Sequence, residues 1–116
     1  MLVVTRFAIG EPEAEAFVAR AHTALAALAA RPGYREGRLG RAVDEPRHWV
    51  LVVDWESVGA YRRALSSYEV KVHATPLLAE ALDEPSAFEV LANAAPGGAV
   101  EVSASDRARG AGAVRS

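Results

Sequence analysis

The sequence predicts one α+β domain built on an antiparallel sheet. Two observations indicate this class: short runs rich in β-branched residues stand near the start and the middle of the chain, and helical patterns follow each of them. A third is size, because 116 residues make one domain and 51% hydrophobic content is enough for a single modest core.

The first two elements are a strand and a long helix. "LVVTRFAI", residues 2–9, is a β-branched run that Gly10 closes. A helix follows, with Pro12 in its first turn and a stop at residues 31–33, "RPG". One apolar face of this helix is predicted from residues at helical spacing, which are Phe17, Ala21, Ala24, Leu25 and Leu28.

The middle of the chain predicts a β-hairpin. Residues 34–43 alternate in character, "DEP" at 44–46 is a turn, and "RHWVLVVDW" at 47–55 is the clearest strand pattern in the chain. Two such strands joined by a short turn pair in the antiparallel sense.

The second half supplies two helical pieces and a last strand. Ser57 is a suitable N-cap for a helix that reaches residue 65. A second helical piece, 67–83, is interrupted near Pro76, and a strand is predicted at 86–93. The resulting order, β-α-β-β-α-β, is the ferredoxin-like arrangement.

Both faces of the strand at 47–55 are apolar, which predicts a second copy of the chain. Val50 and Val52 point away from the face that carries Trp49, Leu51, Val53 and Trp55. One layer of helices covers only one sheet face, so we expect a homodimer with the two sheets packed face to face. Arg6, inside the first strand, is expected to pair across that interface with Asp54 or Glu89.

The composition changes after residue 92. We therefore divide the chain into a domain of residues 1–92 and a flexible tail of residues 93–116 that is rich in Gly, Ala and Ser. An alternative for "GAVEVSA", residues 98–104, is an extra strand added to the sheet edge of a partner.

The charge balance, the residue composition and the length of the apolar runs argue against several classes of protein. Thirteen basic and fifteen acidic residues give a net charge of −2, so nucleic acid is not an expected partner. Cysteine is absent, and the three histidines lack the spacing of a metal site. No apolar run approaches the ~20 residues of a membrane span, and the start of the chain is typical of a strand and not of a signal peptide. We expect a soluble cytoplasmic protein.

Several segments together resemble the antibiotic biosynthesis monooxygenase (ABM) family of the dimeric α+β barrel superfamily. They are "TRFAI", "RPGY", "WVLVVDWES…AY" and "FEVL", and the likeness covers residues 1–92. Its strongest part is a Trp-Glu-Ser passage with an aromatic residue six positions on, here Trp55 and Tyr61. The resemblance implies a dimeric α+β barrel.

The resemblance also implies an activity. Quinone-forming members of the family oxidise anthrone-type phenols with molecular oxygen, without metal or flavin, in a cavity between the sheet and the helices. Trp55 and Tyr61 match the family's hydrogen-bond donors, whereas the family's asparagine and arginine positions hold Leu51 and Thr75. His73 is the candidate general base. Thr5, Leu51 and Trp49 are the expected substrate-binding residues.

Two alternatives to this cofactor-free monooxygenase remain open. The haem-degrading branch of the superfamily has an asparagine, a tryptophan and a histidine where this chain has Thr5, Ala64 and His73. One alternative is therefore a dimeric protein that binds haem or another apolar ligand without turnover. The other alternative is a domain kept for structure or assembly alone, which predicts a closed interior with no cavity next to Trp55.

Overall fold

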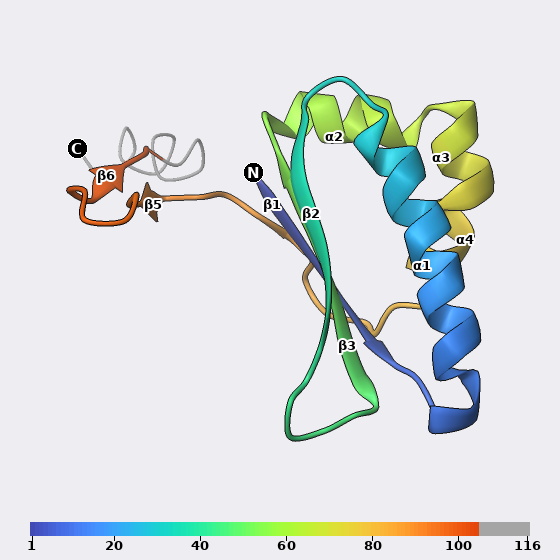
Figure 1. Cartoon of the computed structure of the whole chain (residues 1–116). Helices are drawn as coiled ribbons and strands as arrows, with labels where there is room; N and C mark the ends of the chain where they lie inside the picture. Colours follow the sequence, from blue (N-terminus) through green and yellow to red (C-terminus); the bar gives the residue numbers. More distant parts are fainter. Residues whose placement is uncertain (105–116) are drawn as a thin grey trace.

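A four-stranded antiparallel sheet carries all the helices on one face (Figure 1). The structure is a computed structural model that describes residues 1–104. The strands lie in the order β2-β3-β1-β4 and are β1 (Leu2–Ala8), β2 (Tyr34–Arg41), β3 (His48–Trp55) and β4 (Ala87–Phe88). The helices are the 3₁₀ turn η1 (Glu11–Glu13), α1 (Ala14–Ala29), α2 (Val58–Leu65), α3 (Tyr68–His73) and α4 (Thr75–Leu78). The predicted α+β, ferredoxin-like class is confirmed.

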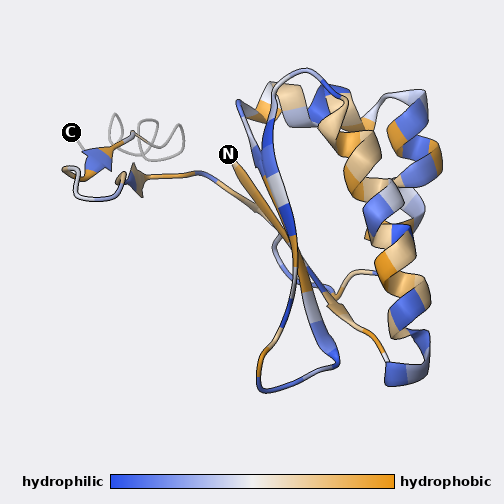
Figure 2. Ribbon diagram, in the orientation of Figure 1, coloured by the Kyte–Doolittle hydropathy of each residue, from blue (hydrophilic) through white to orange (hydrophobic). Residues whose placement is uncertain are grey.

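Strand β3 has the two faces that its alternating sequence predicts. Its helix-facing side chains, Trp49, Leu51, Val53 and Trp55, are buried. Val50 and Val52 point to the opposite face and are only partly buried in the single chain. Figure 2 shows that the strands also differ from one another, since β1 is largely hydrophobic and the edge strand β2 largely hydrophilic. The core therefore lies between the sheet and the helices.

Helix α1 packs on the sheet through the predicted apolar face. Phe17 is 2% exposed, and its ring centroid lies 5.1 Å from that of Phe7 and 5.4 Å from that of Trp49. Ala21 and Ala24 are also buried, and their small side chains let the helix approach the strands closely. Pro12 lies in the 3₁₀ turn that precedes the helix.

The turn between α1 and β2 depends on Gly33. Its φ is +88°, a conformation that L-residues with a side chain rarely adopt. A Cβ atom at Gly33 would lie 2.4 Å from the Cβ of Ala60 in α2. The Gly33 carbonyl also accepts a hydrogen bond of 2.7 Å from the backbone N–H of Glu56. This glycine therefore brings the end of α1 and the start of α2 together.

Helix α2 begins where the sequence predicts. The Ser57 side chain accepts a hydrogen bond of 3.1 Å from the backbone N–H of Ala60, so it is the N-cap. Further on, the helical stretch breaks between α3 and α4 at Ala74, two residues before Pro76. Helix α4 ends at Leu78, earlier than the predicted 83, and the chain turns back toward β1.

The last strand is much shorter than the predicted 86–93. Only Ala87 and Phe88 pair with β1, and Phe88 lies opposite Leu2. If β4 continued antiparallel to β1 beyond Phe88, only Met1 would remain on β1's side to pair with it, so the chain leaves the sheet here. Residues 89–104, which we call the arm, project away from the sheet and the helices (Figure 1).

The arm ends in a small hairpin of two strands, β5 (Ala92–Asn93) and β6 (Glu101–Val102). Strand β6 lies inside residues 98–104, the segment with the alternative prediction of an extra strand. In this structure it pairs with the arm of its own chain. The remainder of the predicted tail, residues 105–116, lies outside the described residues.

The pairing of Arg6 with Asp54 or Glu89 across a dimer interface stays a prediction, and within the single chain Arg6 has another partner. Its guanidinium lies 3.6 Å from the carboxylate of Glu84 in the same chain, and both side chains are about half exposed. The connection from α4 to β4 places Glu84 beside β1, a contact that no local pattern announces. Within residues 1–104, no helix is long and apolar enough to cross a membrane.

Candidate functional site

A cavity of about 320 Å³ opens at the edge of the sheet, between β1, α2 and the connection of residues 79–86. Its wall combines polar and apolar side chains, among them Thr5, Arg6, Tyr61, Leu78, Leu82 and Glu84. Two of the predicted site residues, Thr5 and Tyr61, therefore meet at one cavity.

Backbone hydrogen bonds hold the far wall of this cavity against β1. The N–H of Leu82 donates to the carbonyl of Arg6 at 2.8 Å, and the N–H of Val4 donates to the carbonyl of Ser86 at 2.7 Å. The connection thus follows the edge of β1 that β4 is too short to cover. It brings two carboxylates, Asp83 and Glu84, to the cavity wall.

Thr5 reaches the cavity from the centre of β1. It is the one buried polar residue of the core described for residues 1–104, at 6% exposure. Leu51 lies opposite Thr5 in the β1–β3 pair and is 1% exposed. The predicted substrate-binding pair Thr5 and Leu51 is therefore adjacent, with Thr5 at the cavity and Leu51 in the core beside it.

Trp55 and Tyr61, the two residues that match the family's donors, lie next to each other. Their ring centroids are 5.8 Å apart with an interplanar angle of 45°, and the Tyr34 ring also meets the Trp55 ring edge-on, with the centroids 5.7 Å apart. Trp55 ends β3, and the cap at Ser57 turns the chain so that Tyr61 returns onto it. Tyr61 lines the cavity, whereas Trp55 is 1% exposed and packs behind it.

Burial raises the pKa of the Tyr61 phenol above its ordinary value near 10. The hydroxyl group therefore stays protonated, and can donate a hydrogen bond, throughout the neutral range. Because the folded state favours the neutral phenol, the associated stability is present below about pH 10 and is lost as the pH rises through the raised value.

This shift is open to a direct check by alkaline titration of phenolate absorbance. We expect the native protein to contain tyrosines that ionise above the ordinary range, and the Tyr61→Phe variant to lose one of them. The pKa of Tyr34 is also raised, by burial and by Glu36, so Tyr34→Phe is the matched comparison. A Tyr61→Phe curve that loses only an ordinary tyrosine would contradict the expectation.

His73 lies on a different surface. Its side chain is 43% exposed, and its Nε2 is 3.4 Å from the carboxylate of Glu69 one helical turn earlier. It lines shallow depressions next to α1, with Thr23 and Arg31 among its neighbours. The structure therefore does not bring His73 together with Thr5 and Tyr61.

Trp49 lies at the other end of β3, six residues or about 20 Å from Trp55. The Arg41 guanidinium lies 4.8 Å above its ring, and Phe17 packs against it. The buried indole N–H of Trp49 has no acceptor among the residues that the structure describes. This leaves a free donor inside the helix–sheet layer, remote from the Tyr61 cavity.

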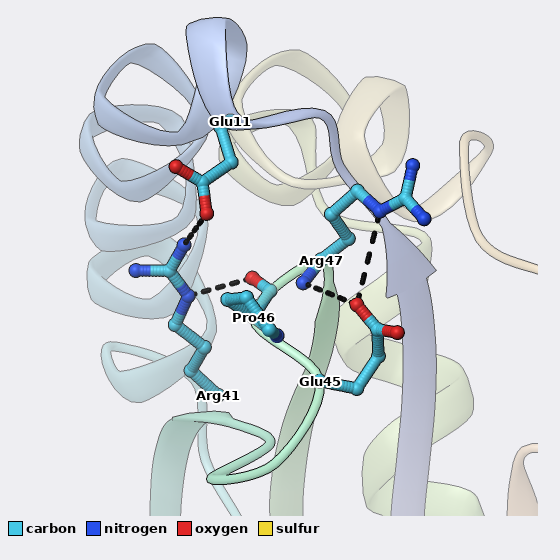
Figure 3. Close-up of polar contacts among 5 residues, drawn as sticks. All are labelled: Glu11, Arg41, Glu45, Pro46 and Arg47. Carbon is cyan, nitrogen blue, oxygen red and sulfur yellow. Dashed lines mark hydrogen bonds and ion pairs between the residues drawn. The ribbon is translucent and has the colours of Figure 1, made fainter.

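Arg41 is held in place over Trp49 by the turn and by η1. Its guanidinium donates to the carbonyl of Pro46 at 2.6 Å and lies 3.7 Å from the Glu11 carboxylate (Figure 3). Beside it, Arg47 and Glu45 form a second ion pair at 3.7 Å. These contacts close the hairpin end of the layer. They depend on the folded hairpin, so no local sequence pattern points to Arg41.

In the described part of the chain, no group of three or more His, Asp or Glu side chains is arranged to hold a metal ion. The polar groups at the cavity are hydroxyls, carboxylates and one guanidinium. Such a set can donate to an oxyanion and accept a proton.

The model of one protein family, antibiotic biosynthesis monooxygenase, matches residues 1–75. The chain belongs to this ABM family. The matched range includes β1, β3, α2 and α3, and with them Thr5, Trp55, Tyr61 and His73. No curated protein matches the chain.

Solved structures extend the comparison. SnoaB from Streptomyces nogalater, described as a cofactor-independent oxygenase, is 30% identical with a TM-score of 0.61, and the alignment covers 78% of this chain and 94% of SnoaB. A conserved protein from Methanosarcina mazei Go1 is 17% identical with a TM-score of 0.62, covering 74% of this chain and 84% of that one. The second likeness shows the fold alone. The first is a likeness to a protein that is described as a cofactor-independent oxygenase.

Proposed function

We propose that this ABM-family chain is a cofactor-independent monooxygenase that oxidises a phenolic polycyclic or polyketide-like substrate with molecular oxygen, as a homodimer in the cytoplasm. The observation that carries the proposal is the convergence of Thr5 and Tyr61 on one cavity backed by Trp55. The similarity to SnoaB supports it, because that protein is described as a cofactor-independent oxygenase.

The chemistry requires little beyond binding, a donor and a proton acceptor. A phenolic anthrone loses a proton from its methylene carbon, and the carbanion passes one electron to oxygen. The two radicals join to give a peroxide, which loses water and leaves the quinone carbonyl, so oxygen is the only oxidant needed. Tyr61 donates to the substrate oxyanion, and the apolar wall limits access of water.

The proton acceptor is either His73 or one of two carboxylates at the cavity. His73 was expected from the sequence, but its side chain belongs to another surface. Asp83 and Glu84 line the cavity itself, and Arg6 holds Glu84 in the wall. The proposal therefore gives this role to the two carboxylates. Loss of turnover in Asp83→Asn with normal turnover in His73→Ala supports this assignment, and the reverse result returns the role to His73.

Oxygen uptake with a hydroxyanthrone, without flavin, metal or nicotinamide and corrected for autoxidation, tests the proposal. We expect uptake above background, and a fall of roughly hundredfold or more in kcat for Tyr61→Phe because one oxyanion donor is removed. Trp55→Phe should lower turnover less, because Trp55 supports the Tyr61 ring and does not line the cavity.

Tyr68→Phe is the matched control, since Tyr68 lies on α3 with 75% exposure and does not line the cavity. Equal turnover in the Tyr61→Phe and Tyr68→Phe variants would overturn the donor role of Tyr61. Circular dichroism of each variant separates a loss of chemistry from a loss of folding.

One observation favours binding without turnover as a second candidate. Trp55 is 1% exposed, so its indole does not reach a ligand in the cavity in this structure. A ligand-induced change in tryptophan fluorescence without oxygen uptake would select a binding protein for an apolar ligand. Haem is distinguished by a Soret band that disappears in His73→Ala, because His73 is the only haem ligand that the sequence suggests.

A further inference from the structure

The connection of residues 79–86 is hydrogen-bonded to the edge of β1 at two points. The N–H of Val4 donates to the carbonyl of Ser86 at 2.7 Å, and the carbonyl of Arg6 accepts from the N–H of Leu82 at 2.8 Å. In an antiparallel sheet, the N–H and C=O of one residue point to the same side of its strand. The N–H of Arg6 therefore points toward the connection and away from β3.

The register of β4 assigns a partner to this N–H, and the chain does not supply it. Leu2 lies opposite Phe88. A regular continuation, from 2 to 6 on β1 and from 88 to 84 on the other side, would place Glu84 opposite Arg6, and the two residues would exchange both backbone hydrogen bonds. The N–H of Glu84 donates instead to the carbonyl of Leu82 at 2.9 Å, and the N–H of Leu82 takes the carbonyl of Arg6. The connection bulges away from the sheet at this point.

Arg6 is thus left with a backbone N–H that has no acceptor. Within residues 1–104, neither a backbone nor a side-chain oxygen accepts a hydrogen bond from it. Backbone N–H groups without a protein acceptor are rare inside folded proteins, where they meet water or a ligand. Because Arg6 lines the 320 Å³ cavity, this donor is available to a molecule that binds there.

Two hydroxyl donors belong to the same cavity wall. Thr5 precedes Arg6 in β1, so one peptide unit joins the Thr5 Cα to this N–H. Tyr61 reaches the wall from α2. In the part of the chain that the structure describes, neither hydroxyl makes a hydrogen bond. Three donors without acceptors of their own therefore line one cavity.

We propose that the backbone N–H of Arg6 donates to the substrate oxyanion, together with the hydroxyls of Thr5 and Tyr61, in an oxyanion hole of three donors. The inference rests on the proposed function, which supplies the oxyanion. The proton that leaves the methylene carbon goes to a cavity carboxylate, and the electron pair left behind delocalises onto the substrate oxygen that the donors hold. A strand N–H is well suited to this role, because the sheet has already fixed its direction before charge develops.

Proton–nitrogen NMR of the full chain with 2,6-dihydroxyanthraquinone tests the proposal. This phenol is already oxidised at the reacting carbon, so binding is observed without turnover. We expect its ionised form to move the Arg6 amide proton downfield and, at saturation, to slow the exchange of that proton by roughly tenfold or more, since a hydrogen bond to a charged oxygen must break first. The Ala8 amide is the internal control, because Ala8 lies on β1 but does not line the cavity.

The free protein gives a first check. Without the probe, the Arg6 amide should exchange faster than the Val4 amide, because only the Val4 N–H has an acceptor. The same difference should appear on substitution by proline, which removes the N–H. Relative to alanine at the same position, V4P should lose more stability than R6P.

The activity test compares R6P with R6A, which removes the same side chain and keeps the N–H. We expect kcat to be roughly hundredfold lower in R6P than in R6A, the effect of one oxyanion donor. Thr5→Val removes the hydroxyl at nearly constant shape and should lower kcat in the same direction. Thr23→Val is its matched control, since Thr23 is exposed on α1 and does not line the cavity.

An Arg6 amide that does not respond at saturating probe would overturn the proposal, and so would a probe that does not bind. Equal kcat in R6P and R6A would also overturn it. The two levels of inference are separable. Oxygen uptake without the Arg6 response would remove this donor and leave the proposed function in place. The Arg6 response without oxygen uptake would support the donor and count against the oxygenase.

Discussion

The Phe17→Ala variant is expected to lose about 3–5 kcal/mol of unfolding free energy, the cost of emptying a large aromatic site in a packed core. Phe17 is 2% exposed, and its ring lies between those of Phe7 and Trp49. It is the main large side chain that α1 inserts toward the β1–β3 pair. Guanidinium chloride unfolding followed by circular dichroism measures the loss.

Two further variants serve as comparisons for the loss of stability in Phe17→Ala. Phe17→Leu keeps most of the volume and should cost under about 1.5 kcal/mol, so it remains measurable if Phe17→Ala does not fold. Tyr68→Ala removes an aromatic ring that is 75% exposed and should change the unfolding free energy by roughly 0.5 kcal/mol or less. Similar losses for Phe17→Ala and Tyr68→Ala would show that the helix–sheet layer is not packed as described.

The Gly33→Ala variant is expected to lose roughly 2–4 kcal/mol, from two separate causes. The residue has a φ of +88°, which is costly for alanine. The added methyl group would also lie 2.4 Å from the Cβ of Ala60, so α1 and α2 would have to move apart. Thermal or denaturant unfolding of the variant measures the sum.

Gly97→Ala separates the two causes. Gly97 also has a positive φ, +71°, but nothing lies within 4 Å of the position its Cβ would take. It should therefore show only the conformational cost, about 1–2 kcal/mol at most. Gly97 lies in the arm, so the conformational cost of Gly97→Ala does not involve the packed core. Equal losses in the two variants would mean that the contact with Ala60 is unimportant.

Much of the fold was predictable because it rests on short-range patterns. Alternation in residues 47–55 indicates a strand with two apolar faces, and the structure places Leu51 and Trp55 on the helix side and Val52 on the other. The helical spacing that includes Phe17 and Leu28 identifies the buried face of α1. Each of these patterns reflects a backbone period, which the local chain determines on its own.

The candidate site was only partly predictable. The spacing of Trp55 and Tyr61 across a strand-to-helix turn places their rings in contact, and that contact is local. Which of the two rings reaches a cavity depends on the connection of residues 79–86, which returns to the edge of β1. The same return places Glu84 beside Arg6, a contact between residues far apart in the chain that no local pattern predicts.

By itself, the sequence determined the class and order of the elements, the two faces of β3 and the Ser57 cap. The tertiary structure alone decided the length of β4, the direction of the arm, the placement of His73 on an outer surface and the carboxylates at the cavity. The reason is the separation in sequence between the residues that interact. Caps, turns and faces follow from neighbouring residues, whereas the register of β1 with β4 and the walls of a cavity join residues far apart in the chain.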